Sequence, residues 1–274
     1  MRKLSLSGRK VLITGAARGL GKQIAVHLAK NEGANLVLVG RNPVSLNDLG
    51  EEISKRCFVK TRIMVKDLLA EHSAQSLYDE LKDDDIYGLV NNAGLTYYGE
   101  SDASHIDLFR SIINLDFRLV VELSLLFFSK FKAEGEGFIL NVTSLASFAP
   151  IPYQAVYAAA KGAAQSFTEC LYQENRGCPV FISTFAPAGI LTDMIHKSGL
   201  TLHMERYRHF YLTPESAARA VIRGLKRGKR LIIPGLMNRL IYLFMNVLPR
   251  HILVRMAGKI YNYEKYRTSD VGRD

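Results

Sequence analysis

The sequence predicts an α/β fold in which helices cover a parallel sheet. The first observation is that short β-rich apolar runs alternate with helical patterns through most of the 274 residues. The second is a glycine-rich turn, Gly15–Gly21, between the first apolar run and the first helical pattern. The third is that loop segments follow several strands, at Asn91–Gly94, Ser144 and Pro187–Thr192. Open α/β sheets bind ligands at the carboxyl ends of their strands, so we expect these segments to meet at one edge.

The composition, with 48% hydrophobic and 23% charged residues, is that of an ordinary globular protein. The length of 274 residues is that of one large α/β domain. The net charge of +10 indicates an anionic partner, such as a phosphorylated cofactor or an acidic lipid surface. No nucleic-acid-binding motif is present, so no nucleic acid partner is expected. The three cysteines form no CxxC pair, which indicates reduced thiols and a cytoplasmic location. No apolar run approaches the ~18 residues that span a bilayer.

The first strand–turn–helix unit has the pattern of a nucleotide site. A strand at 10–14 is followed by three spaced glycines and then by a helix through Ile24 and Leu28. Gly15 permits the tight turn, Gly19 lets the backbone approach a pyrophosphate, and Gly21 lets the helix pack on the strand. The phosphate would lie at the helix N-terminus. A plain turn is the alternative interpretation of the same glycines.

The second strand, at 35–39, indicates which dinucleotide is bound. An NAD site usually places an acidic residue at its end, whereas this chain has Gly40 and Arg41. Arg18 lies inside the glycine turn. Two guanidinium groups near the ribose suit a 2′-phosphate, so we expect NADP(H) rather than NAD(H). In the alternative interpretation, Arg41 is simply a solvated loop residue.

Further apolar runs bring the number of expected strands to seven, at 58–65, 86–90, 137–143, 179–185 and 230–233. Helices are expected at 44–56, 71–81 and 115–131, around Tyr157, and at 213–227. The 115–131 helix is apolar almost all round, which predicts burial on most sides and suggests that a second subunit covers part of it. Residues 193–213 lack a clear pattern and are expected to form an irregular lid over a substrate.

Tyr157 and Lys161 stand four positions apart, on one face of a helix. An ammonium beside a phenol favours the phenolate and lowers the pKa of the phenol from about 10. Such a phenol can exchange a proton near neutral pH, as ketone reduction or alcohol oxidation requires. Taken alone, this pattern also fits an ordinary surface Tyr and Lys.

The ordered set of motifs resembles the short-chain dehydrogenase/reductase family, in its single-domain form of about this length. The resemblance covers residues 8 to 192, and the sheet pattern extends it to about 233; thirteen positions separate Ser144 from Tyr157. The matching residues are Thr14–Gly21, Asp67, Asn91–Gly94, Asn114, Ser144, Tyr157-x-x-x-Lys161 and Pro187 to Thr192. The resemblance implies a doubly wound, Rossmann-type α/β fold, with a seven-stranded parallel sheet and helices on both faces.

The resemblance also implies an NADP(H)-dependent oxidoreductase that moves a hydride between nicotinamide and a carbonyl or secondary alcohol. Tyr157 would protonate the carbonyl oxygen, and Ser144 would donate a hydrogen bond to it. Lys161 would bind the nicotinamide ribose and lower the pKa of Tyr157, while Asn114 would hold a water linked to Lys161. The implied cofactor-binding residues are Gly15, Arg18, Gly19, Leu20, Gly21, Arg41, Asp67, Leu68, Asn91, Ala93, Gly94, Tyr157, Lys161, Pro187, Ile190 and Thr192.

Among these residues, Asp67 would bind the adenine and Thr192 the carboxamide, and no metal is expected. One position departs from the family pattern, which usually reads Pro-Gly where this chain reads Pro187-Ala188, with Gly189 one place later. If that loop needs a positive φ, Ala188 must follow another path.

The C-terminal extension, residues 234–274, follows a single dinucleotide-binding and catalytic domain at 1–233. It is apolar and basic, with nine Lys or Arg against three Asp or Glu from Lys229 onward. Such helices either fold back over the substrate cleft or a partner subunit, or lie on an anionic membrane surface. Both alternatives indicate a lipophilic substrate and a role in lipid metabolism.

Two rival functions stay open at this point. One is a catalytically silent cofactor-binding regulatory or scaffold protein of the same fold, against which the complete set of Asn114, Ser144, Tyr157 and Lys161 argues. The other is a sugar-nucleotide epimerase or dehydratase, for which the chain has little room. A homo-oligomer, either dimer or tetramer, is expected from the apolar helix at 115–131.

Overall fold

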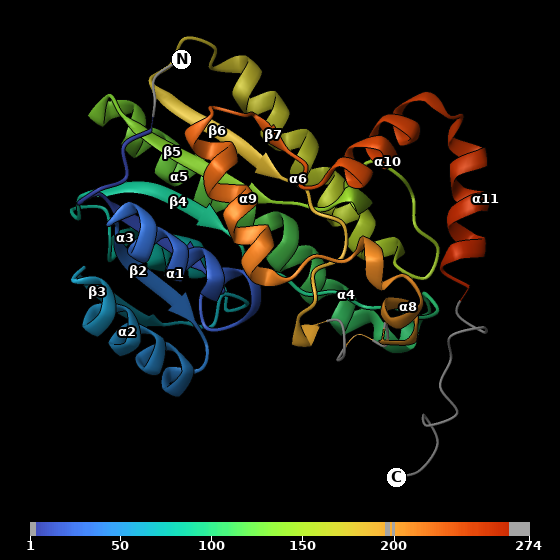
Figure 1. Cartoon of the computed structure of the whole chain (residues 1–274), viewed down its shortest axis with the longest axis horizontal. Coiled ribbons are helices and arrows are strands. Elements are labelled where there is room, and N and C mark those ends of the chain that lie inside the picture. The colour runs from blue at the N-terminus through green and yellow to red at the C-terminus, as the bar shows by residue number, and fades with distance from the viewer. Residues whose placement is uncertain (1–3, 195–197, 199–200, 263–274) are drawn as a thin grey trace.

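A computed structural model describes residues 4–194, 198 and 201–262. Within these residues, seven strands form one parallel sheet in the order β3-β2-β1-β4-β5-β6-β7. The chain crosses from β3 at one edge to β4 beside β1, so the strand order reverses between β1 and β4. This is the predicted doubly wound topology (Figure 1). The strands are β1 (Lys10–Thr14), β2 (Asn35–Gly40), β3 (Thr61–Val65), β4 (Ile86–Asn91), β5 (Gly137–Val142), β6 (Val180–Phe185) and β7 (Leu231–Ile232).

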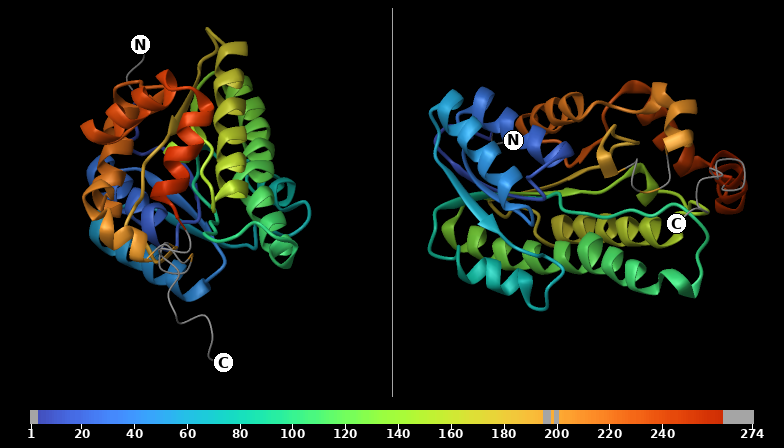
Figure 2. Two further views of the ribbon diagram at one scale, coloured as in Figure 1. Left: turned by 90° about the vertical axis from the view of Figure 1, so that its right-hand side faces the viewer. Right: turned by 90° about the horizontal axis from the view of Figure 1, so that it is seen from below.

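Helices cover both faces of this sheet, as expected (Figure 2). One apolar cluster packs α1, α2 and α9 on one face, and a second packs α3, α5 and α6 on the other. Buried Leu, Ile, Val and Phe side chains of the strands pack between these two helical layers. The helices named so far are α1 (Gly19–Glu32), α2 (Pro43–Cys57), α3 (Ser73–Asp79), α5 (Leu119–Glu134), α6 (Ala155–Glu174) and α9 (Pro214–Lys226).

Two expected boundaries were wrong. β3 begins at Thr61 rather than at 58, because Phe58 takes a left-handed conformation (φ 54°) that ends α2. The helix expected at 115–131 begins earlier, as α4 (Ile106–Ile113), and continues through a π-helical turn at Asn114–Arg118 into α5. Asn114 therefore lies inside a continuous helical run.

The stretch at 193–213 is also more regular than expected. It holds α8 (Thr201–Arg206) and a 3₁₀ turn at Arg208–Phe210. His196, which was part of the predicted lid, lies outside the described residues. No group of three or more His, Cys, Asp or Glu that could hold a metal ion occurs in the described part of the chain.

The C-terminal extension forms α10 (Leu236–Val247) and α11 (Arg250–Ile260), which stand at one end of the molecule beside α8 (Figure 1). The Tyr242 ring lies edge-on to Phe148, with centroids 4.7 Å apart, so α10 contacts the loop that follows β5. None of the helices in the described residues is both long and apolar enough to cross a bilayer.

Candidate active site

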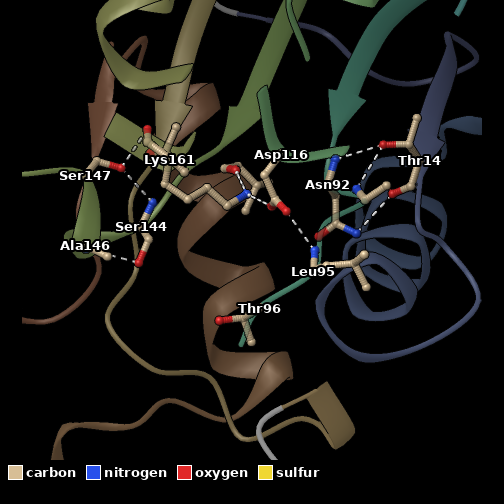
Figure 3. A network of polar contacts seen from close by, with 12 residues as sticks. Thr14, Asn92, Leu95, Thr96, Asp116, Ser144, Ala146, Ser147 and Lys161 are labelled. Atoms are coloured by element: carbon tan, nitrogen blue, oxygen red, sulfur yellow. Dashed lines mark hydrogen bonds and ion pairs between the residues drawn. The ribbon is translucent and has the colours of Figure 1, made fainter. Parts of the chain in front are cut away.

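Four hydrogen bonds, called the clamp below, join Thr14 and Gly15 at the start of the glycine turn to Asn92 and Ala93 after β4 (Figure 3). The Thr14 hydroxyl accepts from the backbone N–H groups of Asn92 (2.9 Å) and Ala93 (3.0 Å). The Asn92 amide donates to the carbonyls of Thr14 (3.0 Å) and Gly15 (3.2 Å). Asn92 was missed among the predicted site residues, although it stands inside the Asn91–Gly94 motif. The clamp joins the carboxyl ends of β1 and β4, where the strand order reverses.

The turn itself needs glycine at two positions. Gly15 has φ +66°, and a Cβ there would lie 2.9 Å from the Cα of Ala93. A Cβ on Gly21 would lie 2.3 Å from the carbonyl oxygen of Gly15. Both distances are shorter than real Cβ contacts, so only glycine allows this close passage of strand, turn and helix.

The N-terminus of α1 fits the phosphates of a dinucleotide. Arg18 is the N-cap residue, but its side chain makes no capping bond, and the first turn holds no acidic residue. The N–H groups of Leu20 and Gly21 therefore point out of the helix without a side-chain cap. Gly19, with φ +56°, brings this turn against Thr192, whose Cγ2 would lie 3.2 Å from a Cβ on Gly19. The structure thus brings the predicted residues Gly19 and Thr192 together.

The predicted ribose side lies next to the same turn. The N–H of Ala16 donates to the carbonyl of Val39 in β2 (3.0 Å), so the turn passes over the strand end that leads to Arg41. Arg18 and Arg41 are both exposed, and no acidic partner is recorded for either within the described residues. Two unmatched cations at this edge suit an anionic group.

The predicted adenine-side residues occupy two different environments. Asp67 is exposed, and its carboxylate accepts from the N–H of Leu69 (3.0 Å). Leu68 is buried in the core cluster that lies under α3 and α5. Cofactor contact by these two residues stays a prediction.

The side chain of Asn91 points into the core and not toward the sheet edge. Its amide donates to the Asn141 side chain (2.8 Å) and the Ser124 hydroxyl (3.2 Å). Asn141 in turn donates to the Thr168 hydroxyl (2.9 Å). These buried groups tie β4 and β5 to α5 and α6. Only the backbone of Asn91 remains available for the predicted role in the cofactor cleft.

Ser144, Tyr157 and Lys161 meet at the end of β5. Ser144 begins the 3₁₀ turn Leu145–Ser147, and its hydroxyl hydrogen-bonds to Tyr157. The Ser147 hydroxyl donates to the carbonyl of Lys161 (3.0 Å), which fixes this turn against α6. The Lys161 Nζ donates to the carbonyl of Val142 (2.9 Å) and lies 6.0 Å from the centroid of the Tyr157 ring.

Asp116 completes this group and was not predicted. One carboxylate oxygen lies 2.8 Å from the Lys161 Nζ, and the other accepts from the N–H of Leu95 (2.9 Å). The Asp116 side chain is 0% exposed. Its signal in the sequence was an acid two positions after Asn114, in an apolar helix that also carries Glu122. The Asn114 side chain makes no hydrogen bond to another described residue, while its carbonyl accepts the π-type bond from the N–H of Leu119.

Burial raises the pKa of Tyr157. The positive charge of Lys161 and the hydrogen bond from Ser144 act to lower this pKa, and the negative charge of Asp116 acts to raise it. The net direction is upward, so the expected lowering by Lys161 exists but is outweighed. Burial acts to lower the pKa of Lys161, but Asp116 and Tyr157 raise it above its ordinary value, and the ammonium is retained. Burial raises the pKa of Asp116, and Lys161 and the Leu95 N–H oppose this.

The loop after β6 accommodates Ala188 without strain, because φ is not positive at that residue. The carbonyl of Pro187 accepts from the N–H of Leu145 (2.8 Å), which binds this loop to the Ser144 turn. Gly189 is needed for a different reason, since a Cβ there would lie 2.0 Å from the Tyr211 ring. Ile190, a predicted cofactor residue, pairs with Leu212 in an isolated bridge.

A cluster of aromatic rings borders the site on the side of α8 and α11. It consists of Tyr98, Tyr153, His203, Tyr207, Tyr211 and Tyr261, and is called the aromatic cluster below. His203 stacks on Tyr261 (centroids 4.4 Å apart) and hydrogen-bonds through Nδ1 to the Tyr211 hydroxyl (3.1 Å). Tyr261 and Tyr157 pack against the same apolar residues. The C-terminal extension therefore reaches the predicted catalytic tyrosine.

The chain is similar to known proteins in sequence and in fold. Residues 9–202 match the family model described as short chain dehydrogenase. Over 195 residues the chain is 30% identical to the very-long-chain 3-oxoacyl-CoA reductase of Homo sapiens, covering 68% of this chain and 61% of that one. The chain thus spans less than two thirds of that relative's length.

Two solved structures share the fold. A short-chain dehydrogenase from Sphingobium yanoikuyae in complex with NADPH has a TM-score of 0.76 at 24% identity, covering 88% of this chain and 97% of that one. A short chain dehydrogenase/reductase from Burkholderia phymatum in complex with NAD has a TM-score of 0.77 at 20% identity, covering 99% of both chains.

Proposed function

The chain belongs to the short-chain dehydrogenase family and is an oxidoreductase, and from this premise we propose that it transfers a hydride between NADP(H) and a carbonyl or secondary alcohol of a lipophilic substrate. The observation that carries the proposal is the meeting of Ser144, Tyr157 and Lys161 at the carboxyl end of β5. Asn114, on the neighbouring π turn, is proposed to hold a water in the same site.

A bound nicotinamide supplies or accepts the hydride, and the side chains of this chain handle the proton and the oxygen. The Tyr157 hydroxyl would donate its proton to the carbonyl oxygen in reduction and take it back in oxidation. Ser144 would donate a hydrogen bond to the same oxygen, since its hydroxyl lies beside that of Tyr157 and makes only a long 3.5 Å donor contact with the carbonyl of Pro187. Lys161 would hold the ribose and stabilise negative charge on Tyr157.

The preference for NADP(H) rests on Arg18 and Arg41. Both guanidinium groups are exposed beside the glycine turn, and β2 ends without an acidic residue. Guanidinium groups bind phosphate bidentately, whereas an NAD site usually offers a carboxylate to the ribose hydroxyls. Solved relatives of the fold hold either cofactor, so the arginines are the only support for this preference.

A lipophilic substrate is supported by the walls around Tyr157. Mostly apolar side chains pack beside it, including those of Tyr97, Phe109, Ile112 and Val156. The aromatic cluster borders the other side. The human relative is named for reducing very-long-chain 3-oxoacyl-CoA, a substrate with a long apolar chain.

The decisive experiment is Tyr157→Phe. We expect turnover of lipophilic ketones to fall at least 1,000-fold while NADPH affinity changes by less than about threefold, because the general acid is removed and the binding surface is kept. Tyr172→Phe, a matched change on the same helix, serves as control. Undiminished turnover in Tyr157→Phe would refute the proposal. If the wild-type chain binds NADPH and reduces no carbonyl, the silent scaffold function stands instead.

For the C-terminal extension, 234–274, beyond the catalytic domain 1–233, we propose peripheral contact with an anionic lipid surface. Exposed apolar residues recur on one face of α10, from Leu236 (73% exposed) to Val247 (81% exposed). No acidic residue occurs from 234 to 260, and Arg250, Arg255 and Lys259 are exposed on α11. An apolar face flanked by cations suits the interface of an anionic membrane.

Vesicle flotation tests this contact. The wild-type protein should float with vesicles containing phosphatidylserine and less with neutral vesicles, and Leu243→Glu/Phe244→Glu should reduce flotation severalfold. Phe58→Glu, which replaces a 95% exposed side chain far from this face, should leave flotation unchanged. Equal flotation of the wild-type and the double variant would contradict the membrane proposal.

A further inference from the structure

The roles carried over from the family leave one charged group of the site without a task. Asp116 is fully buried and lies 2.8 Å from the ammonium of Lys161. A buried carboxylate is costly unless it is paired, so its place beside this particular lysine requires an explanation.

The surroundings of Asp116 are shaped to hold it (Figure 3). The second carboxylate oxygen accepts from the N–H of Leu95, directly after the Asn91–Gly94 motif. Gly94 leaves the necessary space, because a Cβ there would lie 2.5 Å from the carboxylate oxygen. Asp116 itself lies on the π turn between α4 and α5, an irregularity of a kind that is frequent at functional sites. The segment Gly94–Leu95 and the π turn therefore hold the carboxylate against Lys161.

The charged, titratable and hydrogen-bonding groups that face Tyr157 come from four elements. Lys161 is on the same helix, Ser144 follows β5, Asp116 lies on the π turn and Tyr261 follows α11. Lys161 alone would favour the phenolate, whereas a carboxylate against its ammonium cancels much of that charge. The Lys161 Nζ is 6.0 Å from the Tyr157 ring centroid, so the carboxylate lies within about 9 Å of the ring.

We infer that Asp116 is a positioning residue that balances the charge of Lys161 and keeps Tyr157 a protonated phenol at neutral pH, so that the enzyme runs as a carbonyl reductase. The inference rests on the proposed function. In reduction, hydride reaches the carbonyl carbon and the Tyr157 proton reaches the carbonyl oxygen. The substrate is thereby reduced, the nicotinamide is oxidised, and the phenolate regains a proton from solvent. Oxidation would instead need the phenolate at the start, which Asp116 disfavours.

The test is Asp116→Asn, with Asp116→Ser as a second neutral replacement of different shape. Both should move the alkaline limb of carbonyl reduction down by about one pH unit, because the positive charge of Lys161 then acts on Tyr157 alone. The acidic limb of alcohol oxidation should move down with it. Glu122→Gln is the matched control, since that carboxylate is half-exposed and 3.7 Å from Arg118 on the next turn. Its profile should equal that of the wild type.

A readout without turnover uses protein labelled with ¹³C at the tyrosine ζ carbon. The Tyr157 signal, assigned by its loss in Tyr157→Phe, should titrate at lower pH in both Asp116 variants. An unchanged or raised midpoint in a folded variant would overturn the inference. If Tyr157→Phe kept full activity, the proposed function would fail. If only Tyr157→Phe behaved as expected and the Asp116 variants did not shift, the role of Asp116 alone would fail.

Discussion

Gly189→Ala should disturb the substrate side of the site, although glycine at this position does not adopt a positive φ. The added Cβ would lie 2.0 Å from the Tyr211 ring, which would have to move about 1.4 Å to reach an ordinary contact of 3.4 Å. That shift breaks the 3.1 Å bond between Tyr211 and His203. Overpacking costs about 1–3 kcal/mol and the lost bond about 1 kcal/mol, so the melting temperature should fall by about 5–10 °C.

Differential scanning fluorimetry and steady-state kinetics would measure the two effects. The KM for a lipophilic ketone should rise more than the Kd of NADPH, because Tyr211 belongs to the aromatic cluster and not to the glycine turn. Ala188→Gly, which restores the usual family pattern one residue earlier, should change the melting temperature by less than about 3 °C. If Gly189→Ala were as stable as the wild type, with unchanged KM, the contact with Tyr211 would not constrain the loop.

Three further outcomes are expected. Arg41→Ala should weaken NADPH binding about 10- to 100-fold and leave NADH binding nearly unchanged in fluorescence titrations, since only NADPH carries the 2′-phosphate. Equal losses of affinity for NADPH and NADH would contradict the cofactor preference. Asn91→Ala should lower the free energy of unfolding by about 2 kcal/mol in urea titrations, because it removes a donor from the buried side-chain oxygen of Asn141. The control Asn246→Ala, at an exposed site, should change the free energy of unfolding little. Burial lowers the pKa of His203 from 6.5 to about 4, so between these two pH values the folded state binds fewer protons than the unfolded state. The contribution of His203 to stability should therefore be complete above pH 6.5 and decline as the pH falls toward 4. In thermal melts, His203→Phe should flatten this decline.

Local patterns in the chain were sufficient to predict the sheet and its edge. The alternation of apolar runs with amphipathic stretches depends on residues within one element, and it predicted all seven strands and the side on which the loops gather. The glycine turn was equally predictable, because Gly15 and Gly21 are needed where backbone passes backbone. The boundaries that failed, such as Phe58 in a left-handed cap and the start of α4, depend on single residues with weak propensities.

The candidate site was predicted only in part. Tyr157 and Lys161 are four residues apart on one helix, so their proximity follows from helical geometry alone. Asn91 looked like a residue of the cofactor cleft, but the strand turns its side chain toward Asn141 and the core. Asp116 offered no periodic signal, since one acid in an apolar helix fits a surface position as well as a buried one.

The sequence by itself determined the parallel sheet, the glycine turn at its switch point and the pairing of a phenol with an amine. These features depend on backbone hydrogen bonding, steric limits and spacings of a few residues. Only the tertiary structure decided that the carboxylate of Asp116 meets Lys161, that Gly189 lies under Tyr211, and that Tyr261 of the C-terminal extension packs beside Tyr157. Contacts between distant segments depend on how whole elements pack, and no spacing within one element encodes that.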